Sequence, residues 1–418
     1  MGKPEFVVRR RALWQKIQGA YPNKMGVLFF PGDVEHERET FFQDSCFYYF
    51  VGLDEPSLFF CQDQVTQKSF LYEPSYTVDR SLWLPIKRTE ECIKNAGIDA
   101  VLAVGKPVHG YDTGQFIEAE TVQTLLDYLK TVIAEKKHVY VPVTVLSDGS
   151  RCFYEQLCRY LPDLRAATVD ISGLVGELRR IKSHEELEIM YRAVELTAIV
   201  HEAAYDEIAI GKNEAEVQAV MDFVMTQGGA RHAYTPIVGS GKNGTILHYA
   251  DNNKVLGKGE LVVVDAGASY QHYAADITRT YPVSGRFSER QKEIYTLVLS
   301  VQEEIAALAG PGMYLNNSHY PERSLQHLAK KMFEDAGYAQ YFPHSVGHFI
   351  GLDVHDVGDR AKVLEPGDVI TIEPGLYLPQ ESLGVRIEDM YWIVNDGSVC
   401  LSEGIPKTIK ELERTNRH

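Results

Sequence analysis

Two apolar runs in the second half of the chain meet acidic residues at a spacing typical of a β-hairpin. The run 261–264 ends in Asp265, and a second strand-like segment, 273–279, carries Asp276. If the hairpin turns at residues 270–271, its register places the two aspartates directly opposite each other on one face. Their Cβ atoms would then lie roughly 5 Å apart. Two carboxylates at that distance repel each other, and a bound cation or a shared proton is the usual remedy.

A second pair of acidic residues follows the same pattern near the C-terminus. The apolar segment 369–372 leads into Glu373, and the segment 385–387 leads into Glu388. Residues 379–382 between them have the composition of a turn, so a second hairpin is expected here. A single carboxylate is usually an exposed or capping group, but four carboxylates on apolar strands indicate a shared site.

The segment between the two pairs is rich in histidine and glycine. It reads HSVGHFIGLDVHD over residues 344–356 and contains His344, His348 and His355. Imidazoles serve as metal ligands and as proton donors near neutral pH, and glycines permit a close approach of the backbone. We therefore expect this segment to supply a ligand and hydrogen-bond donors to the same site.

Four carboxylates and one imidazole form an oxygen-rich ligand set. Such a set suits manganese or a similar divalent ion better than it suits a structural zinc, which thiolates usually bind. Their four negative charges would balance two divalent cations. Two such ions about 3.5 Å apart can hold a water between them, lower its pKa and polarise a carbonyl group, as amide hydrolysis requires. The residues alone thus predict a two-metal hydrolase, with Mn²⁺ as the expected ion and Co²⁺ and Zn²⁺ as alternatives.

The composition excludes several other classes of protein. The 58 acidic residues outnumber the 42 lysines and arginines, and the net charge of −16 repels nucleic acids and anionic membranes. No apolar stretch of about 18 residues is present, and the basic residues 9–11 are not followed by an apolar signal core. The six cysteines lack C-x-x-C spacing, which argues against a disulfide framework. We expect a cytoplasmic protein with no nucleic-acid or membrane partner.

The first part of the chain alternates helix-like and strand-like segments. Helices are expected at Glu5–Gln18, Phe116–Ile133 and Cys152–Leu161, and strands at Val27–Phe30, Leu58–Cys61 and His138–Val141. This alternation is typical of a small α/β domain with a mixed sheet.

The character of the sequence changes after Gly173. Ser183 and Glu186 form an S-x-x-E capping box that opens a long amphipathic helix. Its apolar residues recur at three- and four-residue steps and share one face, namely Ile189, Met190, Ala193, Leu196, Thr197, Val200 and Ala204. We therefore predict two domains, over residues 1–173 and 174–418.

One glycine-rich loop matches a nucleotide-binding pattern but lacks its context. Residues 239–244 have the G-x-G-x-x-G spacing of dinucleotide-binding loops. No helix is expected after Gly244, because the residues at 251–253 interrupt the segment, and a pyrophosphate site needs that helix. A P-loop is excluded as well, since Pro236 occupies the first glycine position and Asn243 stands where Ser or Thr is needed. Nucleotide binding is therefore rejected.

Five motifs together resemble the pita-bread metallopeptidases, and among them the aminopeptidase P and prolidase branch that acts on Xaa-Pro bonds. The metal-ligand positions of that family are matched in chain order by Asp265 in VVDAGA, Asp276 in AADITRT, His348 in VGHFIG, Glu373 in TIEPG and Glu388 in VRIED. The resemblance covers residues 173–418 and, more weakly, residues 42–56 of the first domain. It implies a creatinase-like α/β N-terminal domain followed by an α+β pita-bread catalytic domain.

The resemblance also implies how the bond is cleaved. A water activated by two metal ions would attack the scissile carbonyl, and Glu373 would relay a proton to the departing proline nitrogen. His355 would stabilise the tetrahedral oxyanion. The implied substrates are short proline-containing peptides, whose Xaa-Pro bond has a tertiary amide nitrogen without an N–H group.

Further residues fall on family positions with less defined roles. His248 and His344 match the substrate-side histidines, and Arg386 lies two residues before Glu388. Arg279 receives no catalytic role, because it can simply pair with a buried acid. Related enzymes are commonly dimers or tetramers, so a homo-oligomer is expected.

Three other functions are alternatives to the release of an N-terminal residue before proline. A prolidase confined to Xaa-Pro dipeptides uses the same motifs, and substrate length stays open between the two. A creatinase-like amidinohydrolase shares the fold but dispenses with the metal ligands. In a non-catalytic peptide-binding module the ligand positions are free to drift. The intact set of five ligand positions argues against the last two.

Overall fold

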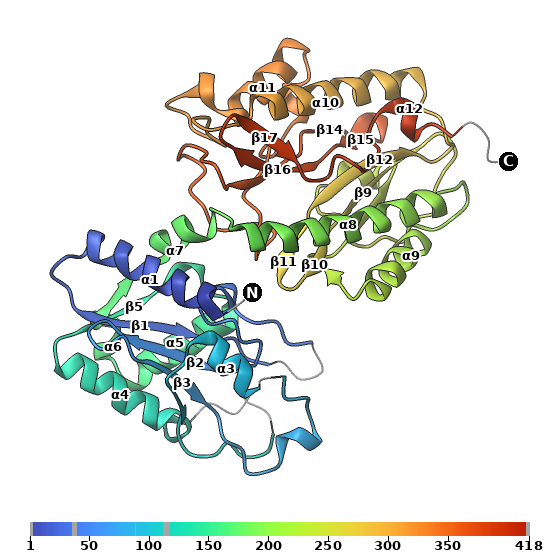
Figure 1. Ribbon diagram of the computed structural model, residues 1–418. Coiled ribbons are helices and arrows are strands. Elements are labelled where there is room, and N and C mark those ends of the chain that lie inside the picture. The colour runs from blue at the N-terminus through green and yellow to red at the C-terminus, as the bar shows by residue number, and fades with distance from the viewer. Residues whose placement is uncertain (1–2, 36–39, 88, 112–117, 415–418) are drawn as a thin grey trace. The chain divides into compact units, whose positions relative to one another are not determined.

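The computed structural model of the chain describes residues 3–35, 40–87, 89–111 and 118–414. It divides into two compact units, Met1–Arg179 and Arg180–His418, and each unit has its own sheets and helices (Figure 1). None of the helices within the described ranges combines the length and the apolarity that crossing a bilayer requires.

The first unit is an α/β domain. Its strands are β1 (Gly26–Pro31), β2 (Phe59–Asp63), β3 (Ser69–Glu73), β4 (Ala100–Ala103), β5 (His138–Val141) and β6 (Thr168–Asp170). Its helices are α1 (Lys3–Ala20), α2 (Ser45–Val51), α3 (Glu90–Ala96), α4 (Gln123–Ala134), α5 (Asp148–Tyr160), α6 (Asp163–Ala167) and α7 (Ser172–Arg179).

The predicted helices and strands of this unit are present, with two differences at helix starts. The helix expected from Phe116 begins as α4 at Gln123, after one 3-10 turn, and residues 116–117 lie outside the described residues. Helix α5 begins four residues before the predicted Cys152, because the side chain of Ser147 caps it by accepting from the Ser150 N–H.

Helices cover both faces of the six-stranded sheet, whose strand order is β4-β3-β2-β1-β5-β6. Strand β1 is antiparallel to β2 and parallel to β5, so the sheet is mixed as expected. On one face Phe59 meets Phe153 of α5 at 5.2 Å between ring centroids. On the other face Phe30 stacks on Phe50 of α2 at 4.8 Å. Burial on both sides explains why β1 is apolar throughout.

The second unit consists of short antiparallel strands packed against long helices. Its strands are β7 (Arg231–His232), β8 (Ile237–Ser240), β9 (Leu261–Ala266), β10 (Ala268–Tyr270), β11 (Tyr273–Ala274), β12 (Ile277–Pro282), β13 (Val369–Ile372), β14 (Gly375–Leu378), β15 (Leu383–Arg386), β16 (Asp389–Val394) and β17 (Gly397–Cys400). Its helices are α8 (His184–Glu207), α9 (Glu214–Gln227), α10 (Glu289–Leu308), α11 (Leu325–Asp335) and α12 (Ile409–Leu412).

Helix α8 confirms the predicted amphipathic helix. The Ser183 side chain accepts from the Glu186 N–H, the Glu186 side chain accepts in return from the Ser183 N–H, and both halves of the capping box are present. All seven residues of the predicted apolar face are buried except Ile189, which is half-buried. This face packs against β10 and β11, while α10 packs against β15 and β17. The α+β arrangement expected for this unit is therefore confirmed.

The first hairpin of this unit differs from the predicted register by two residues. Asp265 pairs with Thr278 rather than with Asp276, so the prediction of directly opposed aspartates is wrong. The turn lies at Gln271 and His272, whose φ angles of 45° and 70° are those of a type I′ turn. Because side chains alternate with a period of two, both aspartates still share one face, as diagonal neighbours.

The second hairpin confirms the predicted acidic pair. Ile372 pairs with Asp389 on one side of the pair, and Gly375 pairs with Arg386 on the other. This continuous register sets Glu373 across from Glu388. Several hydrogen bonds join the two hairpins, among them those from Glu388 N to Thr278 O (3.1 Å) and from Arg386 N to Thr280 Oγ1 (3.1 Å).

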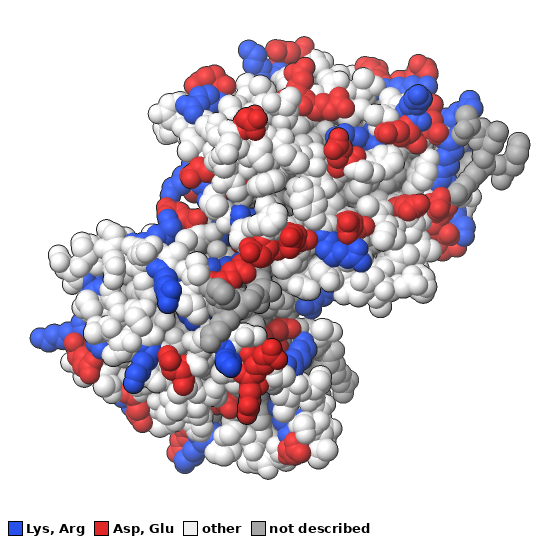
Figure 2. Space-filling view, in the orientation of Figure 1, with Lys and Arg blue, Asp and Glu red and all other residues white. Residues whose placement is uncertain are grey.

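The exposed side of α8 is acidic. It carries Glu185, Glu188, Glu195 and Glu202, and red atoms are frequent along this helix in Figure 2. Elsewhere on the face in view, acidic and basic side chains are interspersed.

Candidate metal centre

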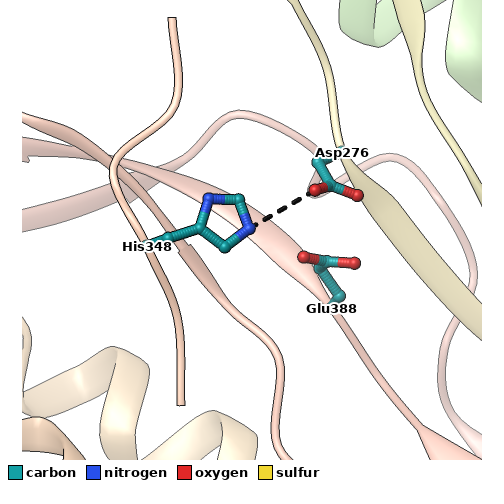
Figure 3. A group of neighbouring side chains, drawn as sticks. All are labelled: Asp276, His348 and Glu388. Atoms are coloured by element: carbon teal, nitrogen blue, oxygen red, sulfur yellow. Dashed lines mark ion pairs between the residues drawn. The ribbon is translucent and has the colours of Figure 1, made fainter. Parts of the chain in front are cut away.

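Side chains from three separate segments converge where the two hairpins meet. Asp276 precedes β12, Glu388 precedes β16, and His348 lies in the loop before β13. Figure 3 shows their functional groups pointing toward one another. One ligand atom from each of the three residues lies within 4.8 Å of the others, and all three side chains are buried. Segments far apart in the sequence thus form one compact group of candidate ligands.

His348 presents one ring nitrogen to the acidic residues. Its Nδ1 lies 3.0 Å from the carbonyl oxygen of Phe349, which can only accept, so Nδ1 carries the proton. Its Nε2 lies 3.4 Å from Asp276 Oδ2 and 3.5 Å from Glu373 Oε1. Burial lowers the pKa of His348, but the charges of Asp276 and Glu373 outweigh burial and raise it above the ordinary value. Nε2 is therefore the atom available to a cation.

Tyr234 connects two of the acidic residues and was not identified from the sequence. Its hydroxyl lies within hydrogen-bonding distance of Asp265 Oδ1 and Asp276 Oδ1. A lone tyrosine before Thr-Pro carries no signal in spacing or periodicity. It reaches the site because β8, which begins three residues later, pairs Ile237 with Asp265.

Arg386 is the buried cation nearest to the acidic residues. Its Nη2 lies 2.5 Å from Asp265 Oδ2, and its Nη1 donates to the Tyr377 hydroxyl at 2.9 Å. Its Nε donates to Thr278 Oγ1 at 3.1 Å, and that hydroxyl donates to Glu388 Oε2 at 2.7 Å. Arg386 thus orients Asp265 directly and Glu388 through Thr278. No pattern in the sequence singles out Thr278 or Tyr377.

The acidic residues carry more negative charge than the surrounding groups neutralise. Burial raises the pKa of Glu373 to about 7 and that of Glu388 well above its ordinary value, and the neighbouring carboxylates add to both shifts. Burial also raises the pKa of Asp265, although Arg386 opposes it. For Asp276, burial is outweighed by His348 and Tyr234, and its pKa lies below the ordinary value. A crowded set of oxygen donors that resists ionisation fits divalent cations, which would supply the missing positive charge.

These shifts predict that metal affinity increases with pH. Without metal, Glu373 holds a proton below about pH 7, and a cation must displace that proton to bind. Calorimetric titration of the metal-free enzyme with Mn²⁺, in two buffers of different ionisation enthalpy, should show more protons released at about pH 6 than at about pH 8. Equal affinity and equal proton release at both pH values would contradict this electrostatic account.

The three predicted catalytic histidines lie around this group. His344 Nδ1 is 3.9 Å from Glu373 Oε2, and burial together with Arg386 lowers its pKa to about 4. The ring of His355 lies 4.4 Å from that of His348, and burial, followed by the charge of His348, lowers its pKa. His248 is exposed, and its charge makes a smaller contribution to both lowered pKa values. His344 and His355 are therefore neutral imidazoles beside the acidic residues.

Arg279 has a structural environment, which confirms the interpretation that it pairs with a buried acid. Its side chain is fully buried, and Nη2 lies 2.7 Å from Asp389 Oδ1. Its other N–H groups donate to the carbonyl oxygens of Thr278, Glu388, Ile405 and Pro406. Arg279 holds the strand that follows Glu388 rather than the ligands themselves.

The glycine-rich loop at 239–244 is occupied by a carboxylate of the chain itself. Glu214, the first residue of α9, is fully buried, and its Oε1 accepts from the N–H and the hydroxyl of Ser240, both at 2.7 Å. Its Oε2 accepts from the Tyr249 hydroxyl at 2.8 Å and from the Lys254 N–H at 2.9 Å. A single 3-10 turn, Asn243–Thr245, stands where a dinucleotide site would begin its helix.

Buried carboxylates, an imidazole with a fixed tautomer and neutral histidines beside them define the site of a metal-dependent hydrolase. Comparisons with known proteins agree with this class. The model of metallopeptidase family M24 matches residues 188–395, and the model of the aminopeptidase P N-terminal domain matches residues 6–107.

Some relatives match over nearly the whole chain and others over part of it. The Xaa-Pro aminopeptidase of Escherichia coli K12 is 31% identical over 445 residues, covering 99% of this chain and 97% of the relative. The Xaa-Pro dipeptidase of Pyrococcus furiosus is 39% identical over 247 residues, covering 58% of this chain and 67% of the relative. The structure of E. coli aminopeptidase P with the inhibitor Pro-Leu has a TM-score of 0.82 at 28% identity, covering 99% of this chain and 98% of that chain. The chain belongs to metallopeptidase family M24, in its aminopeptidase P branch, and it has the pita-bread fold of that family.

Proposed function

We propose that this chain hydrolyses the Xaa-Pro bond of short peptides and releases the N-terminal residue that precedes proline, as a metal-dependent aminopeptidase. The observation that carries this proposal is the convergence of Asp276, His348 and Glu388 in a chain that matches an Xaa-Pro aminopeptidase from end to end. Asp265 and Glu373 complete the proposed ligand set for two ions.

The residues around the centre divide the chemistry between them. When bound, the two ions lower the pKa of a water and polarise the scissile carbonyl. Glu373 places Oε1 beside His348 and Oε2 beside His344, so one oxygen faces the ligands and the other faces the substrate-side histidine. It is thus placed to accept a proton on one side and return it to the proline nitrogen on the other. The proline nitrogen needs that proton because it departs as an amine, and an unprotonated amide nitrogen is a poor leaving group.

The histidines and Arg386 act on the substrate and on the ligands. His355 is neutral beside His348, so its N–H can donate to the oxyanion that develops on the carbonyl oxygen. His344 is held by the Tyr377 hydroxyl at 2.9 Å, and His248 lies on an exposed loop, as expected of groups that meet a substrate. Arg386 keeps Asp265 oriented and ionised.

Manganese is the proposed ion, because the ligand set is rich in carboxylate oxygen and contains no thiolate. Cobalt and zinc stay alternatives, and one solved relative is a zinc-substituted E. coli aminopeptidase P in complex with product. A cytoplasmic location and a dimeric or tetrameric assembly stay predictions from the sequence.

A dipeptidase is the second candidate function. The P. furiosus Xaa-Pro dipeptidase is more similar in sequence, at 39%, but its match covers 58% of this chain. The aminopeptidase match extends over the first unit, where the aminopeptidase P N-terminal model also matches. This difference in coverage favours the aminopeptidase.

The test compares Gly-Pro, Gly-Pro-Phe and the control peptide Gly-Ala-Phe. Metal-stripped enzyme is assayed alone and with Mn²⁺, Co²⁺ or Zn²⁺, and released glycine is measured. We expect metal-dependent release from Gly-Pro-Phe and none from Gly-Ala-Phe. Cleavage of Gly-Pro alone would instead establish a dipeptidase, and no cleavage with any of the three ions would point to a peptide-binding module.

A further inference from the structure

A buried ion pair lies beneath the loop that carries His348 and His355. Lys182 Nζ is 3.3 Å from Asp356 Oδ2, and both side chains are 1% exposed. Lys182 stands just before α8, where its N–H donates to Gly367 O, and Asp356 directly follows His355. A buried charge is costly to the fold unless it is paired, so removing either member of this pair should disturb the other.

The backbone of Asp356 shares an acceptor with the metal-ligand histidine. The Asp356 N–H donates to the carbonyl oxygen of Phe349 at 2.9 Å, and the same oxygen accepts from His348 Nδ1 at 3.0 Å. This carbonyl fixes the tautomer that leaves His348 Nε2 free for a cation. The position of Asp356 is therefore coupled to the orientation of His348.

The backbone of this loop packs closely against the ion pair at Gly351. A Cβ atom on Gly351 would lie 2.2 Å from Asp356 Oδ2 and 2.9 Å from Lys182 Nζ, so the backbone of Gly351 rests against both charged groups. The carbonyl oxygen of Gly351 accepts from the Ala274 N–H at 2.8 Å, two residues before Asp276. Only glycine leaves enough space for this contact.

We propose that the Lys182–Asp356 ion pair is a positioning device that holds His348 in its ligating orientation and sets His355 beside it. This proposal rests on the proposed function, in which His348 binds a metal ion and His355 faces the substrate. Without Lys182, the Asp356 carboxylate loses the buried cation 3.3 Å away, and its side chain can shift. Such a shift draws the Asp356 N–H away from the Phe349 carbonyl and moves the adjacent His355.

The experiment compares Lys182→Met, Asp356→Asn and the double variant with a matched control. Arg180→Met is the control, because Arg180 is also buried and basic, lies two residues earlier and pairs with Asp368 through Nε at 2.7 Å. Its guanidinium lies 5.2 Å over the ring of Phe349, so this variant tests support of Phe349 through its ring rather than through its carbonyl oxygen. Three properties are measured for each full-length protein: the ¹⁵N-edited spectrum of the histidine side chains without metal, the dissociation constant for Co²⁺ alone, and kcat and KM for Gly-Pro-Phe.

Lys182→Met should weaken Co²⁺ binding and lower kcat by about 10- to 100-fold each, with little change in KM. In the metal-free spectrum, recorded at a pH high enough to deprotonate His348, the Nδ1–H tautomer should give way to a mixture. The double variant should lose less than the two single losses combined, since the two substitutions remove the same interaction. Arg180→Met should lower stability while leaving the His348 signals as in the parent.

The proposal is overturned if Lys182→Met retains both the His348 tautomer and the Co²⁺ affinity, whatever its stability. It is also overturned if Arg180→Met changes the two properties as much, because the effect would then belong to any buried basic residue here. The histidine spectrum and Co²⁺ binding need no substrate. They therefore decide the question even if Gly-Pro-Phe is not cleaved and the proposed function fails.

Discussion

Asp276→Ala should lower kcat/KM on an Xaa-Pro tripeptide on the order of 1,000-fold or more, while leaving the fold intact. Asp276 lies between the groups that hold the centre together, with one oxygen near Tyr234 and the other 3.4 Å from His348 Nε2. Its removal takes away a ligand that the two proposed ions share. Activity and metal content, measured by atomic absorption after dialysis, should both fall.

The stability of this variant separates a metal ligand from a structural residue. In the metal-free enzyme, removing Asp276 relieves its repulsion with the other carboxylates but also loses its contacts with His348 and Tyr234, so the free energy of unfolding should change little. Asp251→Ala is the matched control, because Asp251 is an exposed aspartate of the same unit. Near-normal turnover of Asp276→Ala, with activity equal to that of the control, would rule out the two-metal assignment.

Arg386→Met should destabilise the metal-free enzyme by about 3–5 kcal/mol, the cost of leaving a buried charge without its partner. Arg386 is 5% exposed and is the cation that compensates Asp265, at 2.5 Å. The pKa of Asp265 is raised already, and it would rise further without Arg386. A carboxyl group with a raised folded-state pKa stabilises the fold at low pH, and this contribution is lost as the pH increases.

The destabilisation caused by Arg386→Met should therefore be larger at about pH 8 than at about pH 5, where Asp265 is free to take up a proton. Urea unfolding of metal-free protein at both pH values measures the difference. Arg386→Lys is the informative control, because lysine keeps the charge but cannot make the separate bonds to Tyr377 and Thr278. A loss of stability that is the same at both pH values would show that Arg386 acts through packing rather than charge.

The acidic residues of the site could be predicted because they interrupt apolar strands, where a carboxylate needs a reason to be present. The exact pairing of Asp265 could not, since a type I′ turn usually contains Asn or Gly. Here Gln271 and His272 adopt the positive φ angles instead. The surrounding structure overrides this local preference, and the aspartates become diagonal neighbours.

The residues that support the ligands could not be predicted from the sequence, for a different reason. Tyr234 and Thr278 touch the acidic groups only because strands β8, β9 and β12 pair in one register. Each is a common residue at an unremarkable position, and its role arises from contacts across the sheet. In the sequence, Lys182 is likewise only a charged residue before a helix. The fold places it beside Asp356.

The contacts of Glu214 show what occupies the glycine-rich loop, which the spacing of its glycines alone does not indicate. Glycines at 239, 241 and 244 shape a backbone that can receive an oxyanion, and the oxyanion it receives is the side chain of a helix 25 residues earlier. Phosphate and carboxylate make equivalent demands on a set of N–H and O–H donors. A glycine-rich pattern of this kind therefore predicts an anion-binding loop. The rest of the fold determines whether a ligand or a side chain of the protein itself occupies that loop.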